Sequence, residues 1–86
     1  MIGSGVSIII PTLNEATSLG RTLRLLQLLS PPASEVLVVD GGSDDETIAV
    51  AKAFDVRVFS SEKRGRSIQM NLGADAATGD FLCFLH

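Results

Sequence analysis

Short apolar runs alternate along the chain with longer stretches in which apolar residues recur at helical spacing. The clearest run is Val36–Val39, an unbroken series of apolar β-formers, which is typical of a strand buried on both faces of a sheet. Val6–Ile10 and Phe81–Leu85 have the same character, and Val56–Phe59 is a shorter version. The pattern therefore predicts a strand at each run, and the first strand is expected to stop at Pro11.

Helices are predicted in the three intervals between these strands. The first follows a turn at Pro11–Glu15 and ends at Ser30–Pro32, and the others span residues 44–53 and 67–77. Spacing by about 3.6 residues gives each helix an inward stripe. The stripes are Leu19, Leu23 and Leu26, widened by Leu25, Leu28 and Leu29; then Ile48, Ala51 and Phe54; then Ile68, Leu72 and Ala76.

Two spacings predict where helices begin. Thr12 is followed three residues later by Glu15, and Ser43 is followed in the same way by Glu46. Both pairs have the spacing of a capping box, in which the two side chains satisfy each other's free backbone N–H groups.

The order of elements predicts a Rossmann-like α/β fold. A βαβαβαβ chain with short connections and right-handed crossovers forms a parallel sheet with helices on both faces. If the first strand is central, the strand order is 3-2-1-4. A ligand crevice is then expected at the carboxyl ends of the strands, lined by Pro11–Glu15 and Asp40–Ser43.

Composition narrows the setting. The 86 residues predict one small domain, and a net charge of −3 argues against a nucleic-acid partner. Cys83 is the single cysteine and cannot form an internal disulfide, so a reducing, cytoplasmic location is expected. Residues 1–5 lack the features of a signal peptide, and no apolar run is long enough for a transmembrane segment.

The candidate chemistry lies in three places. Glu15 and Asp40 follow neighbouring strands, and Arg64 and Arg66 follow the third strand. Carboxylates accept hydrogen bonds from a base or ribose, whereas arginine binds phosphate bidentately, so the combination suits a nucleotide. Neither a G-x-G-x-x-G loop nor a Walker P-loop is present. The residues also have plainer interpretations: Asp40 as a turn former, Glu15 as a helix cap, and the arginines as solvated charges.

Three motifs carry a resemblance to a known family. They are I-I-I-P-T-L-N-E at 8–15, V-V-D-G-G-S-D-D at 38–45 and N-L-G-A-D-A-A-T-G-D-F-L-C-F-L at 71–85. Together they resemble the amino-terminal half of family-2-type glycosyltransferases. The resemblance implies a GT-A fold and transfer of a sugar from a nucleotide-sugar donor, expected to be UDP-linked. The segment G-R-S-I-Q-M-N, with His86, is similar to a bacterial subgroup of the arsenosugar-biosynthesis type.

The resemblance also implies roles for individual residues. The nucleotide-binding set it implies is Pro11, Thr12, Glu15, Asp40, Gly42, Ser43, Arg64 and Arg66. Thr12 and Glu15 are expected to contact the nucleoside, and Asp40 is expected to hydrogen-bond the base. Arg66 is the first choice for the diphosphate, with Arg64 second.

Family members continue past the last strand with an acidic motif that holds Mg²⁺ or Mn²⁺, followed by a catalytic base. The sequence stops at His86, so metal ligands and catalytic residues are expected to be absent from residues 1–86. We therefore expect a single, truncated nucleotide-sugar-binding domain that is inactive alone. The alternative is a non-catalytic nucleotide-binding or assembly module. A nucleotidyltransferase is a weaker alternative, because Pro11–Glu15 is not the glycine-rich loop that class needs.

The last strand predicts self-association. Phe81–Leu85 is apolar on both faces, yet the order 3-2-1-4 places it at a sheet edge. Exposed apolar edges are templates for pairing with another chain. A homo-oligomer joined through this strand is therefore expected.

Overall fold

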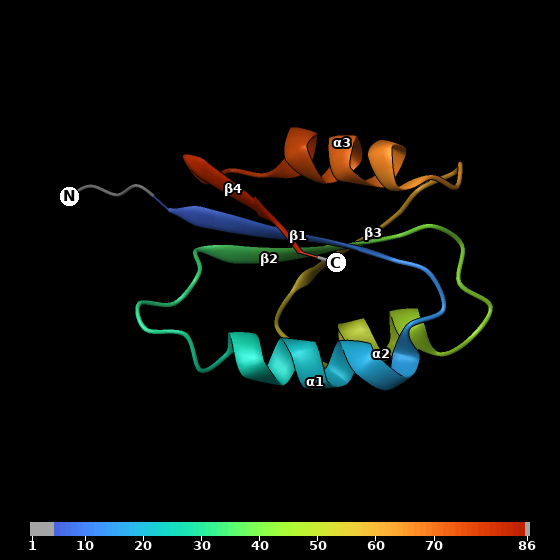
Figure 1. Cartoon of the computed structure of the whole chain (residues 1–86), viewed down its shortest axis with the longest axis horizontal. Helices are drawn as coiled ribbons and strands as arrows, with labels where there is room; N and C mark the ends of the chain where they lie inside the picture. Colours follow the sequence, from blue (N-terminus) through green and yellow to red (C-terminus); the bar gives the residue numbers. More distant parts are fainter. Residues whose placement is uncertain (1–4, 86) are drawn as a thin grey trace.

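The structure is a computed structural model that describes residues 5–85. Strands and helices alternate along the described chain, as the sequence predicts (Figure 1). The elements are β1 (Val6–Thr12), α1 (Ala16–Leu26), β2 (Glu35–Asp40), α2 (Thr47–Lys52), β3 (Arg57–Ser60), α3 (Arg66–Ala76) and β4 (Phe81–Phe84).

The strands form one parallel sheet in the order β3-β2-β1-β4, which confirms the predicted Rossmann-like topology. Helices α1 and α2 cover one face of the sheet and α3 covers the other (Figure 1). Alternation along each strand divides the core accordingly. Ile8, Ile10 and Val38 pack with α1 and α2, whereas Ile9 and Val39 pack toward α3.

Strand β1 continues through Pro11, so the prediction that proline stops it is wrong. The carbonyl oxygen of Ile9 accepts the Leu85 N–H at 2.9 Å, so the backbone polar groups of Ile9 point toward the β4 side of β1. Pro11, two residues later, faces the same side. Because β4 ends at Phe84, opposite Ile9, Pro11 lies beyond the paired part of β1 on that side, and the N–H that proline lacks interrupts none of the β1–β4 pairs.

Both predicted capping boxes are wrong. Helices α1 and α2 begin at Ala16 and Thr47, with no side-chain cap from Glu15 or Glu46. Instead, the Asp45 carboxylate accepts the Ala16 N–H at 3.2 Å and the Thr47 N–H at 2.9 Å. One acidic side chain thus serves the beginnings of two helices: its bond with Thr47 is local, whereas its bond with Ala16 joins residues 29 positions apart and depends on tertiary contact.

Two predicted apolar stripes are also corrected. Helix α1 ends at Leu26, so Leu28 and Leu29 lie beyond it and are exposed. In α3, Ile68 is 42% exposed, and the buried residues are Gln69 and Gly73. A Cβ atom at Gly73 would lie 2.5 Å from Cγ2 of Ile9, so this glycine lets α3 approach the sheet directly. Backbone proximity therefore decides which side of α3 faces inward.

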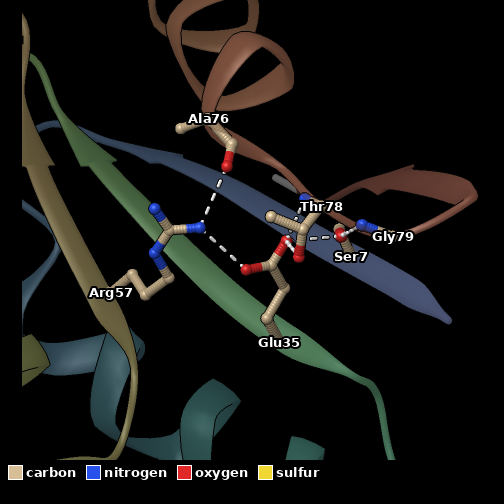
Figure 2. A network of polar contacts seen from close by, with 6 residues as sticks. All are labelled: Ser7, Glu35, Arg57, Ala76, Thr78 and Gly79. Carbon is tan, nitrogen blue, oxygen red and sulfur yellow. Dashed lines mark hydrogen bonds and ion pairs between the residues drawn. The ribbon is translucent and has the colours of Figure 1, made fainter.

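A polar network closes the amino end of the sheet (Figure 2). Its centre is Glu35, the first residue of β2. The Glu35 carboxylate accepts hydrogen bonds from the Ser7 hydroxyl at 2.7 Å, the Thr78 N–H at 2.6 Å and Arg57 at 2.8 Å. Arg57 also donates to the carbonyl oxygen of Ala76 at 2.9 Å. The network thus connects the end of α3 to the amino ends of β1, β2 and β3.

Strand β4 is exposed along its whole length, and Phe81 is 60% exposed. It pairs only with β1 in the sheet, as the predicted order requires. Within residues 5–85, none of the helices has the length and apolar character that crossing a membrane requires.

Candidate functional site

Asp40 ends β2 and organises the loop that follows. It is 0% exposed, and its carboxylate accepts four hydrogen bonds. Oδ1 takes the Thr12 hydroxyl at 2.9 Å and the Ser43 hydroxyl at 2.6 Å. Oδ2 takes the N–H groups of Gly42 at 3.0 Å and Ser43 at 2.7 Å. These donors use the full acceptor capacity of an ionised carboxylate.

The pKa of the Asp40 carboxyl is held below its ordinary value. Burial is the largest single influence and acts in the opposite direction, because it penalises the charged form. The hydrogen bonds from the Ser43 side chain and N–H, from Thr12 and from Gly42 together outweigh it. Asp40 is therefore an anion held by neutral donors.

The loops after β1 and β2 are fastened to each other, and residues 12–16 and 40–47 are called the paired loops below. The Asn14 N–H donates to Oγ of Ser43 at 2.8 Å, and the Glu15 N–H donates to Oγ1 of Thr47 at 2.8 Å. In return, Oδ1 of Asn14 accepts the N–H groups of Asp44 at 2.8 Å and Asp45 at 3.3 Å. The site is therefore shaped before any ligand arrives.

Asn14 adopts a φ of 53°, in the left-handed region. Asparagine tolerates this region better than most residues, and here its side chain gains two backbone donors. No role in the site was predicted for Asn14 from the sequence. The available signal was its place directly after a strand-ending motif, but its partners lie about 30 residues further along the chain.

The residues predicted after β1 occupy different depths. Pro11 and Thr12 are buried, and the Thr12 hydroxyl is engaged by Asp40. Glu15 is partly exposed, and its Oε1 accepts the Leu13 N–H at 3.0 Å. Glu15 also lies on the wall of a groove of about 360 Å³ between α1 and the carboxyl end of β1. Glu15 is thus the accessible carboxylate of this pair, whereas Asp40 is enclosed.

The two predicted arginines precede or begin α3. Nη2 of Arg64 donates to the carbonyl oxygen of Gly42 at 3.3 Å, so this guanidinium lies directly beside the loop after β2. Gly42 has a φ of 100°, a conformation that side-chain-bearing residues rarely adopt. Arg66 is the first residue of α3 and is exposed. The structure therefore brings Arg64, the second choice, nearest to the paired loops.

Gln69 is a further polar residue at this edge that the sequence analysis missed. Its Nε2 donates to the carbonyl oxygens of Thr12 at 2.9 Å and Val39 at 2.8 Å. Buried helix residues are predicted from apolar periodicity, to which a polar glutamine does not contribute. The only sequence signal that Gln69 faces the sheet was its position four residues before Gly73.

The arrangement of acidic side chains bears on whether the described residues hold a divalent metal. Within residues 5–85, no three His, Cys, Asp or Glu side chains come together as a metal site. Asp40 is filled by protein donors and Asp45 is bound to Thr47 and Ala16. Asp40 and Asp45, held in this way, do not fit a divalent metal.

Comparison with known proteins identifies relatives along nearly the whole chain. Residues 7–86 match the family model described as Glycosyl transferase family 2. A PGL/p-HBAD biosynthesis glycosyltransferase from Mycobacterium bovis is 39% identical over 85 residues, covering 92% of this chain and 33% of the relative. Glycosyltransferase AglE from Haloferax volcanii is 35% identical over 88 residues, covering 93% of this chain and 29% of the relative.

Solved structures agree. Glucosyl-3-phosphoglycerate synthase from Mycobacterium tuberculosis, solved with Mn²⁺, UDP and glucosyl-3-phosphoglycerate, superposes with a TM-score of 0.80 at 26% identity. That match covers 96% of this chain and 33% of the synthase. Mannosyl-3-phosphoglycerate synthase from Rubrobacter xylanophilus gives a TM-score of 0.86 at 26% identity, covering 93% and 29%. The chain thus spans about a third of the length of the relatives it matches. The narrower arsenosugar-type resemblance stays a prediction.

Proposed function

The chain belongs to glycosyl transferase family 2, and from that premise we propose that its paired loops bind the nucleoside diphosphate of a sugar donor. The whole protein would then transfer the sugar to an acceptor, with residues 5–85 providing the donor-binding half. UDP is the nucleotide we propose, because the synthase of the same fold was solved with UDP bound.

The observation that carries the proposal is the position of Arg64 beside a preformed pair of loops. A bound nucleotide presents a neutral base and ribose at one end and a diphosphate at the other. The paired loops offer the partly exposed Glu15 and Ser43, whose carboxylate and hydroxyl oxygens can accept hydrogen bonds from a base or ribose. Arg64, 3.3 Å from the Gly42 carbonyl oxygen, offers the positive charge a diphosphate requires.

We propose two kinds of role for the site residues. Glu15, Gly42 and Ser43 are the groups that reach the nucleoside, and Arg64 with Arg66 faces the diphosphate. Thr12 and Asp40 act behind them: their side chains bond to each other and hold the Gly42 and Ser43 N–H groups in place. Contact of Asp40 with the base would require it to exchange one of its four present donors.

Titration with UDP, followed by backbone amide shifts, tests the proposal. We expect a dissociation constant on the order of millimolar, with shifts concentrated at residues 12–15, 40–43 and 64–66. Arg64→Ala should weaken UDP binding by about tenfold, because it removes a charge-assisted phosphate contact. Arg21→Ala is the matched control, since Arg21 is an exposed arginine on α1. Shifts spread evenly over the chain, or none at saturating UDP, would refute the proposal.

Two broader expectations remain proposals. We propose that β4 mediates self-association, because its four residues are exposed and mostly large and apolar, at a sheet edge. Sedimentation equilibrium at micromolar concentration tests this, and a monomer would contradict it; Leu82→Lys with Phe84→Lys should abolish any dimer.

We also propose a cytoplasmic location, because the exposed thiol of Cys83 is best preserved in a reducing compartment.

A further inference from the structure

The amide of Gln69 joins a helix to the ends of two strands. Gln69 lies in the first turn of α3 and is 5% exposed. Both hydrogens of Nε2 are used, one on the carbonyl oxygen of Thr12 and one on that of Val39. Because both partners are acceptors, the nitrogen and not the oxygen of the amide must face them. Thr12 and Val39 belong to neighbouring strands, at the point where the paired loops leave the sheet.

Little else holds the first turn of α3. The buried residues of this helix are Gln69 and, one turn later, Gly73, while Ile68 is exposed. Gly73 fixes how closely the helix lies on the sheet, because a Cβ there would collide with Ile9. Because Leu72, Ala74 and Ala76 hold the later part of α3 against the sheet, any tilt of the helix would move its first turn most. Gln69 is the side chain that opposes such movement at the end of the helix where Arg66 lies.

The loop after β2 is shaped to admit this amide. A Cβ atom at Gly41 would lie 3.0 Å from both Cδ and Oε1 of Gln69, so the glycine leaves the room the amide occupies. The Gly41 N–H donates to the carbonyl oxygen of Thr12 at 2.9 Å, the same oxygen that Gln69 reaches. One oxygen at the end of β1 therefore receives a donor from the loop and a donor from α3.

We propose that Gln69 is a positioning residue that sets the approach of Arg64 and Arg66 to the paired loops. Arg64 precedes the helix by two residues and already reaches the Gly42 carbonyl oxygen. Fixing the first turn of α3 against Thr12 and Val39 therefore fixes the distance between these guanidinium groups and the loop after Asp40. This role rests on the proposed function, because it matters for binding only if the arginines face a diphosphate.

The first test compares UDP with uridine. Gln69→Met keeps the length of the side chain but removes both donors. We expect UDP to bind about tenfold more weakly while uridine affinity changes by less than about twofold, because misplacement affects the phosphate end of the ligand. A purely structural residue would lower the melting temperature without changing the ratio of the two affinities. Gln27→Met is the control, because Gln27 is an exposed glutamine that follows α1.

The second test needs no ligand. In the free protein, Gln69→Met should speed hydrogen exchange at the backbone N–H of residue 69, which in the parent protein donates to the Gly65 carbonyl oxygen at 3.0 Å. The amide of Ser43, held by Asp40, should keep its protection. Gly41→Ala is a second variant that keeps both donors but pushes the amide aside, and it should give a smaller change in the same direction.

The exchange rates and the two affinities together distinguish the positioning role of Gln69 from the proposed binding of UDP. Unchanged exchange in both variants would overturn the positioning role. Faster exchange with an unchanged ratio of UDP to uridine affinity would overturn it as well, leaving Gln69 as a structural residue. If the parent protein binds no UDP, the proposed function fails and the effect on the diphosphate fails with it, while the exchange result still decides whether Gln69 anchors the helix.

Discussion

Strand β2 begins and ends with a carboxylate, and the two are held in different ways. Glu35, at the amino end, accepts hydrogen bonds from Ser7 of β1 and from Thr78 in the connection after α3, and it forms an ion pair with Arg57 (Figure 2). Asp40, at the carboxyl end, bonds to four neutral donors, three of them from Gly42 and Ser43 just after it. The first joins elements distant in sequence, whereas the second mainly shapes one loop.

The difference separates a structural network at one end of β2 from the proposed binding site at the other. The backbone N–H of Thr78 and the hydroxyl of Ser7 are the main causes that lower the pKa of Glu35 to about 2, against the effect of burial. Its bonds close the connection between α3 and β4, far from the paired loops. At Asp40 the donors leave a formal charge of −1 without a cation in direct contact, close to Arg64. The proposed nucleotide site thus lies at the carboxyl end of β2, whereas the amino end is closed by the bonds of Glu35.

Glu35→Ala gives the largest expected effect, and it falls on stability. Removing the carboxylate leaves the Ser7, Thr78 and Arg57 donors without their shared acceptor, so we expect a loss of about 2–3 kcal/mol in the free energy of unfolding. Urea denaturation measures this loss. Glu62→Ala is the control, because Glu62 is exposed. UDP affinity should be unchanged in the fraction that remains folded; a large loss of affinity would show that the two ends are not independent.

Asp40→Asn should affect both properties. A neutral amide cannot accept all four donors, and its NH₂ group would face N–H groups, so we expect about 1–2 kcal/mol of destabilisation. UDP affinity should fall by about tenfold, because the loop of Gly42 and Ser43 loses its fixed form. Calorimetric titration and urea denaturation measure the two effects. Asp44→Asn, at an exposed neighbouring aspartate, should change neither; equal effects at both positions would point to charge alone.

The two carboxylates also predict how stability depends on pH. A carboxyl whose pKa is lower in the folded protein contributes stability that is fully present above its unfolded pKa and is lost as pH falls through the folded value. For Glu35 the relevant window runs from the ordinary value of 4.5 down to about 2. The free energy of unfolding should therefore fall as pH is lowered through this range. Glu35→Gln should flatten that dependence, and an unchanged slope would contradict the network's role.

Arg57→Ala should give the smallest effect. Arg57 is 45% exposed, and its ion pair with Glu35 spans 2.8 Å. Exposed ion pairs contribute little, so we expect a loss of about 0.5–1 kcal/mol that shrinks at high salt. Urea denaturation at two salt concentrations measures both quantities, with Arg24→Ala on the exposed side of α1 as the control. A loss comparable to that of Glu35→Ala would mean that the ion pair, and not the neutral donors, stabilises this end.

Features that depend on patterns local in the sequence were predicted correctly, whereas features that depend on contacts between distant residues were not. Strand order, sheet type and the placement of Asp40 at the end of β2 were predicted, because unbroken apolar runs and short connections leave few topologies. Helix beginnings were predicted wrongly, because Ser43 and Thr12 had a partner, Asp40, that competes for their hydroxyl groups. On α3, Leu72 and Ala76 pack inward as predicted, but Ile68 does not, because Gly73 brings the helix backbone against Ile9 and Gln69 takes the inward position in the first turn.

The sequence by itself therefore determined the alternation of elements, the parallel sheet and the edge where polar side chains gather. Those features follow from periodicity along the chain, which is a local property. Only the tertiary structure decided that Asp40 is enclosed, that Asn14 fastens two loops, and that Gln69 bridges β1 and β2. Each of these features includes at least one hydrogen bond between residues 28 to 57 positions apart. Directional bonds of that kind have no periodicity in the sequence, and they form only when packing has brought their partners together.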